Sequence, residues 1–376
     1  MIIAWDITSK CNLSCKHCYN FRLYDAAGVA AKTGDLSTSD ILAFLQTLPR
    51  DEVEHIQFLG GEPFARQDML EILRYAQGTG ICCNVATNGI LLDDETIVDL
   101  AEIAPSQIAF SIDGATPASN DCLRGKGSFE KSVGCLGRLS KYFHEKGCTS
   151  QIGIQCTINQ ANVSEIASIV TLAKSQSLDF VSFDALKALH EEARAFLPSR
   201  EQTWDCLHQI ARLMAQERAI DISVLNFGSP RIRHLLNEKY GLKLQVDRYC
   251  PAGSETMYIR ADGLVSPCNY CSDFPLDILH GAVQHQELSV ARHTFEEIVD
   301  SEYLKSFYTF AHYGALYEHL PYCKDCPLFE TCEPCPLDVA RYGEGVNTEC
   351  RQFDQYIAEG KRNGHGPFEC KECVQC

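Results

Sequence analysis

Three cysteines near the start of the chain have the spacing of a metal-binding loop. Cys11, Cys15 and Cys18 form a C-x3-C-x2-C triplet. Three thiolates on one loop suit an iron–sulfur cluster, whose irons take tetrahedral sulfur ligation, and they leave one iron without a protein ligand. His17 lies inside the triplet, so a zinc site with three cysteines and one histidine is the alternative. The triplet thus predicts a metal centre, and an iron–sulfur cluster is the preferred interpretation.

A glycine-rich segment follows the apolar run 56–59. It consists of Gly60, Gly61, Glu62 and Pro63. The two glycines let the backbone come close to a ligand, and Glu62 supplies an anionic acceptor for an ammonium group. Taken alone, the same residues are also typical of a turn after a strand.

Further polar positions follow later predicted strands. They are Asn88, Ser111, Asp113 and Arg124. Asn-Gly and Asp-Gly are common turn dipeptides, and a single arginine is usually solvated, so each position taken alone has an ordinary structural interpretation. Their order after the triplet favours contacts with a ligand.

The triplet, the glycine-rich segment and these polar positions together resemble the radical S-adenosylmethionine (SAM) enzymes. The resemblance implies a [4Fe-4S] cluster whose unique iron binds the amino and carboxylate groups of SAM. It places Asn88, Ser111 and Asp113 near the ribose and amino acid ends of SAM, and Arg124 near its carboxylate. The SAM contacts that it implies are His17, Gly60, Gly61, Glu62, Pro63, Asn88, Ser111, Asp113 and Arg124.

The second half of the chain carries a different cysteine pattern. Cys250, Gly263 and Cys268 have the spacing C-x12-G-x4-C, which predicts a hairpin that turns at 261–263. A later run contains Cys323, Cys326, Cys332, Cys335 and Cys350. This pattern resembles the SPASM domain, an extension with two auxiliary iron–sulfur clusters. Two residues separate Cys332 from Cys335, where the family pattern has three, so this chain departs from the pattern at Cys335.

The SPASM resemblance also implies which cysteines share a cluster. The second auxiliary cluster would use Cys323, Cys326, Cys332 and Cys350. The first would use Cys250, Cys268 and Cys335, with Cys271 as the candidate fourth ligand because no other cysteine lies between Cys250 and Cys323. An iron left open for substrate or water is the alternative to Cys271. Zinc sites are the alternative for the whole pattern.

Apolar runs alternate with helical periodicity through the first half of the chain. Short apolar runs predict buried strands at 2–7, 55–59, 81–86, 107–112, 151–158 and 180–183. Between them, helices are expected at 37–48, 68–77, 93–103, 129–146 and 162–175. Such alternation predicts parallel strands with right-handed crossovers. The expected fold is α/β: a partial (β/α)6 TIM barrel as the radical SAM core, followed by a small cysteine-rich SPASM domain.

Length and composition limit the remaining possibilities. We expect a barrel over 1–186, a helical bridge over 187–249, the auxiliary-cluster domain over 250–355 and a tail over 356–376. A net charge of −17 argues against a nucleic-acid or anionic-membrane surface. There is no apolar run of membrane-spanning length and no signal peptide, so we expect a cytoplasmic protein. The 21 cysteines then indicate metal rather than disulfides. Cys370, Cys373 and Cys376 fall outside the family pattern.

The function expected from these resemblances is an oxidoreductase or maturase that cleaves SAM to a 5′-deoxyadenosyl radical and abstracts hydrogen from a peptide or protein. The cofactors would be SAM and three [4Fe-4S] clusters. The partners would be a reductant such as flavodoxin or ferredoxin and the peptide or protein substrate. Because Met1 begins directly on a predicted strand, either the barrel and the C-terminal half would recognise this substrate or a separate leader-peptide-binding protein would deliver it. The product would carry a crosslink, a thioether or an oxidised side chain.

Other functions stay open at this point. A SPASM enzyme acting on a small molecule, such as a decarboxylase of haem biosynthesis, is the first alternative. A sulfatase-maturating enzyme is disfavoured because Asn269 stands where those enzymes tend to carry an aspartate base. A non-catalytic iron–sulfur or zinc scaffold would explain the cysteines but not the other motifs. Tyr19, Asn269 and Cys271 are the candidate catalytic residues, chosen by position.

Overall fold

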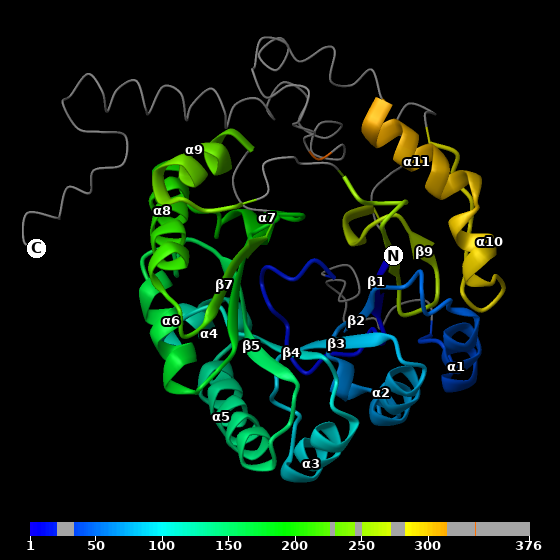
Figure 1. Ribbon diagram of the computed structural model, residues 1–376, viewed down its shortest axis with the longest axis horizontal. Coiled ribbons are helices and arrows are strands. Elements are labelled where there is room, and N and C mark those ends of the chain that lie inside the picture. Colours follow the sequence, from blue (N-terminus) through cyan, green and yellow to red (C-terminus); the bar gives the residue numbers. More distant parts are fainter. Residues whose placement is uncertain (21–33, 226–229, 245–249, 272–282, 314–334, 336–376) are drawn as a thin grey trace, which may run out of the picture.

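The computed structural model describes residues 1–20, 34–225, 230–244, 250–271, 283–313 and 335 (Figure 1). The statements below concern these residues. Within them, no helix is long and apolar enough to cross a membrane.

One sheet organises the described residues, in the order β7-β6-β5-β4-β3-β2-β1-β8-β9. Every neighbouring pair is parallel except β8 and β9, which are antiparallel. The strands are β1 (Ile2–Asp6), β2 (His55–Leu59), β3 (Cys82–Thr87), β4 (Gln107–Ser111), β5 (Gln151–Ile158), β6 (Phe180–Ala185), β7 (Asp221–Leu225), β8 (Thr256–Ile259) and β9 (Val265–Ser266). The carboxyl ends of the parallel strands meet at one edge, where barrel sites gather.

Helices cover the outside of this curved sheet (Figure 1). Those of the first half are α1 (Thr38–Thr47), α2 (Met69–Gly78), α3 (Asp94–Ile103), α4 (Pro117–Arg124), α5 (Ser128–Lys146) and α6 (Ile166–Ser175), with the short η2 (Pro63–Ala65). Later come α7 (Glu191–Arg194), α8 (Arg200–Gln216), α9 (Pro230–Tyr240), η3 (Asn269–Cys271), α10 (Phe295–Val299) and α11 (Glu302–Tyr313). The fold is the expected partial barrel: six predicted strands and the helices between them are confirmed, with shifts of a few residues at their ends.

Strand β1 explains how the sheet separates its core from its cavity. Alternate residues of a strand face opposite sides of a sheet. Trp5 is fully buried on the helix side, where its ring lies 5.7 Å from Phe44 of α1 and 6.4 Å from Phe58 of β2. Ala4, on the other face, lines the cavity. The same alternation along the other strands gives an apolar outer layer and a more polar interior.

The structure extends the barrel beyond the six predicted units. The segment expected to be only a helical bridge also contributes β7, which pairs with β6. Strand β8 joins the opposite edge of the sheet beside β1, and the predicted hairpin is confirmed by its pairing with β9. Gly263 in its turn has a φ of +83°, a conformation that favours glycine. The auxiliary half is therefore joined to the barrel by a continuous hydrogen-bonded ladder.

Candidate active site

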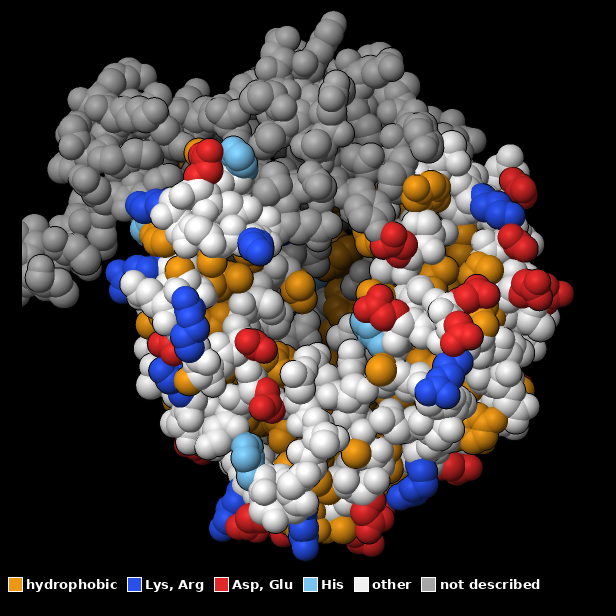
Figure 2. Space-filling model, in the orientation of Figure 1, with side chains coloured by type: hydrophobic (Ala, Val, Ile, Leu, Met, Phe, Trp, Pro, Cys, Tyr) orange, Lys and Arg blue, Asp and Glu red, His pale blue; other side chains and the backbone are white. Residues whose placement is uncertain are grey.

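A cavity of about 480 Å³ opens at the carboxyl ends of the parallel strands. Figure 2 shows the molecule hollowed at its centre, with hydrophobic side chains in the walls. The three cysteines of the triplet line the cavity, as do Gly60, Gly61, Glu62, Asn88, Ser111, Arg124 and His17. The structure thus brings together, around one space, residues that lie more than one hundred positions apart in the chain.

The cysteine loop after β1 is fixed by backbone contacts to the glycine-rich segment. The Gly61 N–H donates to the Thr8 carbonyl at 2.8 Å, and the Glu62 N–H donates to the Lys10 carbonyl at 2.8 Å. Gly60 has a φ of +138°, and a Cβ there would lie 2.6 Å from the Thr8 carbonyl oxygen. Only glycine fits this close approach of two backbones.

A carboxylate that the sequence did not single out holds the start of the same loop. Asp35 accepts hydrogen bonds from the Ser9 N–H at 2.8 Å and the Ser9 hydroxyl at 2.7 Å, and it also accepts one from the Thr8 hydroxyl. Burial opposes the charged form of Asp35, but these donors outweigh it and lower the pKa of the carboxyl. The loop is anchored from both sides before its first cysteine.

Glu62 is buried and connects the ends of β2 and β3. Its Oε1 accepts hydrogen bonds from the Thr87 hydroxyl at 2.6 Å and the Phe64 N–H at 3.3 Å, and its Oε2 accepts one from the Asn88 N–H at 2.8 Å. Burial raises the pKa of Glu62, and these donors partly offset the effect. A carboxylate has about four lone-pair sites, so three bonds leave room for one more donor. Its contact with a SAM ammonium stays a prediction.

Asn88 is paired with the cysteine loop. Its Nδ2 donates to Asn12 Oδ1 at 2.8 Å, and the Asn12 amide donates back at 3.4 Å. Asn12 lies directly after the first cysteine, so this pair fixes the loop against the end of β3. No sequence motif marked Asn12. The only sequence feature that could have drawn attention to Asn12 is that a polar residue lies inside the triplet.

Asp113, Arg124 and His17 form a buried ionic cluster. Arg124 Nε lies 2.6 Å and His17 Nε2 lies 3.1 Å from Asp113 Oδ2, and the Thr157 N–H donates to Oδ1 at 2.8 Å. Burial alone would raise the pKa of Asp113, but Arg124 and His17 hold it well below its usual range. Arg124 also contacts the Cys15 thiol. Three predicted SAM contacts are therefore partners of one another.

The cysteines of the hairpin form a second group. Cys268 and Cys271 Sγ lie 3.3 Å apart, and the Cys271 N–H donates to the Cys268 carbonyl at 3.0 Å. Burial raises the pKa of Cys271, and the neighbouring Cys268 and, to a smaller degree, Cys250 raise it further. Cys335 packs against the same core. Cys323, Cys326, Cys332 and Cys350, and the tail cysteines Cys370, Cys373 and Cys376, lie outside the described residues.

Family patterns match this chain in two places. The radical SAM superfamily pattern matches residues 5–170, and that of the SPASM iron–sulfur cluster-binding domain matches residues 250–327. The chain belongs to the radical SAM superfamily. It is a radical SAM enzyme with a C-terminal SPASM domain, and SAM and [4Fe-4S] clusters are the cofactors that these two domains imply.

Relatives of this radical SAM enzyme are named for different activities. The AdoMet-dependent heme synthase of Oleidesulfovibrio alaskensis is 27% identical over 351 residues, which cover 86% of this chain and 81% of the relative. Mycofactocin maturase MftC of Mycobacterium tuberculosis is 30% identical over 171 residues, 46% of this chain and 41% of MftC. The relatives thus leave the type of substrate unresolved.

Solved structures share the fold of this radical SAM enzyme. Streptococcus suis SuiB bound to S-adenosylmethionine aligns with a TM-score of 0.67 at 17% identity, covering 92% of this chain and 75% of SuiB. Native anSMEcpe with bound AdoMet aligns with a TM-score of 0.65 at 17% identity, covering 96% of this chain and 97% of that one. At this identity the likeness concerns the fold.

The donor set of the triplet fits a cluster better than a single zinc ion. The three thiols influence one another electrostatically around the same cavity. Cysteines of a [4Fe-4S] cluster each bind a different iron, so they surround a space rather than converge on a point. His17 bonds Asp113 rather than completing a zinc site.

The thiols of the triplet need help to ionise. Burial raises the pKa of Cys18 to about 12 and also raises that of Cys15, where Arg124 acts in the opposite direction. Thiolates are the form that binds metal, so iron would have to displace these protons. The contact with Arg124 favours the charged form of Cys15.

A buried carboxylate at the end of β1 was also missed by sequence reasoning. Asp6 accepts hydrogen bonds from Tyr19 Oη at 2.8 Å, Asn20 Nδ2 at 2.7 Å and the Tyr258 hydroxyl. Burial raises its pKa to about 6, although these donors act to lower it. Tyr19, a candidate catalytic residue, and Tyr258 both line the cavity. Asp6 therefore ties the cysteine loop to strand β8 of the auxiliary half.

Proposed function

We propose that this radical SAM enzyme abstracts hydrogen from a side chain of a peptide or protein and so creates a crosslink, a thioether or an oxidised side chain. Cys11, Cys15 and Cys18 would hold the cluster that binds SAM. Cys250, Cys268, Cys271 and Cys335 would hold the first auxiliary cluster, and Cys323, Cys326, Cys332 and Cys350 the second. When bound, the reduced cluster and SAM together supply the 5′-deoxyadenosyl radical.

The residues of the chain bind and orient the reactants. Arg124 would face the SAM carboxylate while Asp113 keeps its guanidinium in place at 2.6 Å. The remaining lone-pair site of Glu62 and the backbone of Gly60 and Gly61 would receive the ammonium group. Ser111 lies at the end of β4, beside the cavity, where the ribose hydroxyls would lie. Burial of this constellation excludes water from a reactive radical.

The proposal that a peptide side chain is the substrate rests on the size of the cavity. Cavities for small molecules measure roughly 300–1,000 Å³, and this one measures about 480 Å³. SAM would use a large share of that space. The remainder suits one side chain of a longer chain, whose backbone would stay at the opening. The structure of SuiB with its precursor peptide SuiA is an example with this fold.

Haem-type chemistry is the second candidate function. The observation that favours it is the 27% identity to the heme synthase over most of both chains. A tetrapyrrole is far larger than a side chain and carries several carboxylates. The cations that line the cavity among the described residues are Arg124, which is paired with Asp113, and Lys187. The size of the cavity favours the peptide.

The first experiment measures SAM cleavage. The anaerobic protein is reconstituted with iron and sulfide, reduced and mixed with SAM, and 5′-deoxyadenosine is quantified beside a Cys18→Ala control. We expect product from the wild type alone. Absence of product from wild-type protein that carries its full iron content would contradict the proposed function. If 5′-deoxyadenosine forms, mass spectrometry separates the two candidate substrates. It shows whether the same mixture modifies a peptide encoded beside the gene or a coproporphyrin.

A further inference from the structure

Lys187 brings a positive charge to the cavity from the residues just after β6. It is partly buried and lines the cavity. Arg124 also lines it, but lies 2.6 Å from Asp113, and His17 contacts the same carboxylate. Of the lysine and arginine side chains that line the cavity in the described part of the chain, Lys187 thus stands outside the buried ionic cluster.

The charges of SAM are complemented by other residues in the proposed function. Its carboxylate would face Arg124, its ammonium would face Glu62, and its sulfonium would lie at the cluster of the triplet. SAM therefore has no negative group left for Lys187. A charge that loses its water needs an opposite charge, and SAM and substrate together would displace water from the cavity. This requirement favours a substrate that brings an anion to Lys187.

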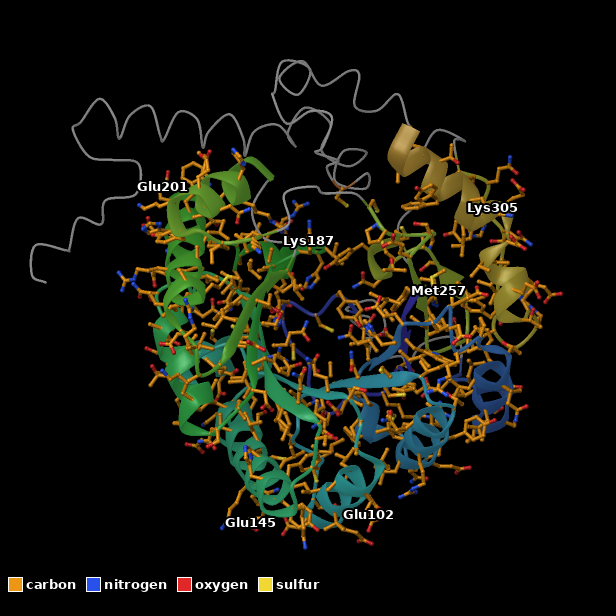
Figure 3. The ribbon with its side chains drawn as sticks, in the orientation of Figure 1. Glu102, Glu145, Lys187, Glu201, Met257 and Lys305 are labelled. Atoms are coloured by element: carbon orange, nitrogen blue, oxygen red, sulfur yellow. The ribbon has the colours of Figure 1, made fainter. Side chains whose placement is uncertain are left out.

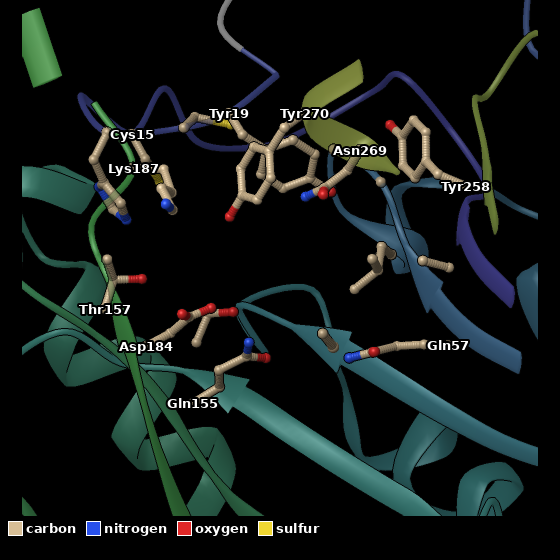
Figure 4. Close-up of a pocket in the computed structure, with 18 of the residues that line it drawn as sticks. Cys15, Tyr19, Gln57, Gln155, Thr157, Asp184, Lys187, Tyr258, Asn269 and Tyr270 are labelled. Atoms are coloured by element: carbon tan, nitrogen blue, oxygen red, sulfur yellow. The ribbon is translucent and has the colours of Figure 1, made fainter. Parts of the chain in front are cut away.

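The position of Lys187 relates it to both groups of cysteines. Figure 4 shows Lys187 on the side of Cys15, a member of the triplet. Figure 3 shows it across the central space from Met257 of β8, the strand that leads into the hairpin. The pKa of the Cys268 thiol is lowered by its contact with Cys271 and, to a smaller degree, by the charge of Lys187. A substrate held between SAM and the hairpin would therefore pass Lys187.

The nearby cysteines do not use the whole binding capacity of Lys187. A lysine ammonium carries three N–H donors, so it can face a cluster with one donor and a carboxylate with another. The four-carbon stem also lets the ammonium adjust to the position of its partner. Attraction to the cluster sites is thus compatible with a substrate anion.

Asp184 is an acidic side chain on the same wall of the cavity. It lies opposite Thr157 in the register of β5 and β6, and Figure 4 shows both residues in a different part of the cavity from Lys187. An anion that lay against β5 and β6 would be repelled by Asp184, whereas one at Lys187 would be attracted. The two charges therefore favour one position for a negative group.

We propose that Lys187 binds a carboxylate of the substrate and so holds the neighbouring carbon atoms between SAM and the hairpin. A peptide would supply this group as an acidic side chain or as its C-terminal carboxylate, and a porphyrin would supply it as a propionate. The inference rests on the proposed function of the cavity. It adds the chemical group by which the site recognises its substrate.

The test uses deuterium transfer from simple probes. The probes are the perdeuterated N-acetyl amides of glutamate, glutamine and lysine, perdeuterated N-acetylvaline as acid and as amide, and coproporphyrin with deuterated propionates. Each is added separately to the reduced, fully reconstituted enzyme with SAM. Abstraction moves one deuterium atom from a C–D bond to the 5′ carbon of 5′-deoxyadenosine. The carbon radical that remains takes up an electron from dithionite and a proton from solvent. Mass spectrometry measures the labelled fraction of 5′-deoxyadenosine.

At least one carboxylate probe should give about tenfold more label than its matched neutral amide, because only the carboxylate forms a charge-assisted hydrogen bond with the ammonium. An excess of glutamate over glutamine identifies an acidic side chain, and an excess of N-acetylvaline over its amide identifies a C-terminal carboxylate. Equal labelling within both pairs, or no label from any carboxylate probe, overturns the proposal.

The same mixtures separate this inference from the proposed function. Unlabelled 5′-deoxyadenosine with every probe contradicts the carboxylate site and leaves SAM cleavage intact. Absence of 5′-deoxyadenosine contradicts the proposed function. Label from coproporphyrin alone that is lost in Lys187→Glu supports the carboxylate site but contradicts a peptide as the substrate.

Charge reversal at Lys187 locates the specificity. Lys187→Glu should raise labelling from the lysine probe relative to the glutamate probe at least about tenfold, because the reversed charge attracts a cation and repels an anion. Lys187→Arg keeps the charge and should keep the preference for carboxylates. The matched control is Lys131→Glu, since Lys131 is exposed on α5. An unchanged ratio in Lys187→Glu, or the same response from Lys131→Glu, overturns the proposal.

Two further readouts separate substrate binding from other roles of Lys187. The KM for SAM, measured by 5′-deoxyadenosine formation without a probe, should change less than about twofold in Lys187→Glu. A larger rise in this KM with unchanged label ratios would assign Lys187 to SAM and overturn the proposal. Saturation-transfer NMR with the oxidised enzyme and SAM ranks binding of the probes without turnover. If Lys187 acted only on electron transfer to a cluster, Lys187→Glu would leave this ranking unchanged, which would also overturn the proposal.

Discussion

The cysteine loop after β1 and the cysteine pair of the β8–β9 hairpin are held in place in different ways. The loop is tied by side chains from several strand ends, including the buried Asp113 and the amide of Asn88. The hairpin pair depends on a short local turn, in which Cys271 N–H bonds the Cys268 carbonyl. The loop thus depends on contacts between distant parts of the chain, whereas the hairpin pair depends on neighbouring residues.

The largest expected difference between the two sites concerns SAM cleavage. Cys18→Ala should abolish 5′-deoxyadenosine formation, because it removes a proposed ligand of the SAM-binding cluster. Cys271→Ala should retain SAM cleavage but change the iron content and the electron paramagnetic resonance signal of an auxiliary cluster. Iron analysis and spectroscopy of both proteins check this expectation.

Cys206→Ala is the control for these cysteine variants, because Cys206 is fully buried in α8, away from both groups. It should leave iron content and spectra unchanged. Loss of SAM cleavage in Cys271→Ala, with normal iron in the cluster of the loop, would break the distinction between the two sites.

The buried ionic cluster of the loop should contribute strongly to stability. Asp113→Asn leaves Arg124 and His17 without their anion in a site from which water is excluded. Breaking a buried ion pair costs about 3–5 kcal/mol. Chemical denaturation should therefore show a loss of this order in the free energy of unfolding.

The matched control is Asp99→Asn, since Asp99 pairs with Arg74 at 3.2 Å on the surface, where both side chains are at least 36% exposed. An exposed pair contributes about 0–1 kcal/mol. Equal losses in the two variants would mean that the cluster around Asp113 is not the anchor of the loop.

Asp6, which joins the two regions, should give the smallest effect and a distinct pH dependence. Burial raises its pKa to about 6, above the value near 3.9 of an unfolded aspartate. The folded state thus holds the proton more tightly, and its stability falls as pH rises from about 4 to 6. The expected loss is at most roughly 3 kcal/mol.

Asp6→Asn removes this titration. Unfolding measured from pH 4 to 7 should therefore give a flatter profile for the variant than for the wild type. Parallel profiles for the two proteins would show that Asp6 does not titrate in this range. Tyr258→Phe, which removes one donor to Asp6, should shift the midpoint of the wild-type dependence upward.

Local patterns were sufficient to predict much of the fold and the members of the site. The period of two in β1 and the capping residues of α1 are properties of adjacent residues, so they can be recognised in one sequence. Strand β7 could not be predicted in this way. Its burial alternates only weakly, and its pairing with β6 depends on a partner about forty residues earlier.

The chemistry of individual site residues was harder to predict. Glu62, Asn88 and Arg124 were chosen as contacts for SAM, yet each also holds another part of the protein in place. Asp6 and Asp35 had no motif to mark them. Their partners lie at least 13 residues away in the chain, so their hydrogen bonds exist only after folding.

The sequence by itself determined which residue types are present and at what spacing: the triplet Cys11, Cys15 and Cys18, the glycines that permit backbone contact, and the alternation of strands and helices. The tertiary structure decided which of these residues meet. Cys268 of the hairpin reaches the cavity that the triplet lines because β8 returns to pair with β1. Such long-range pairing is set by the packing of the whole sheet, and no local spacing encodes it.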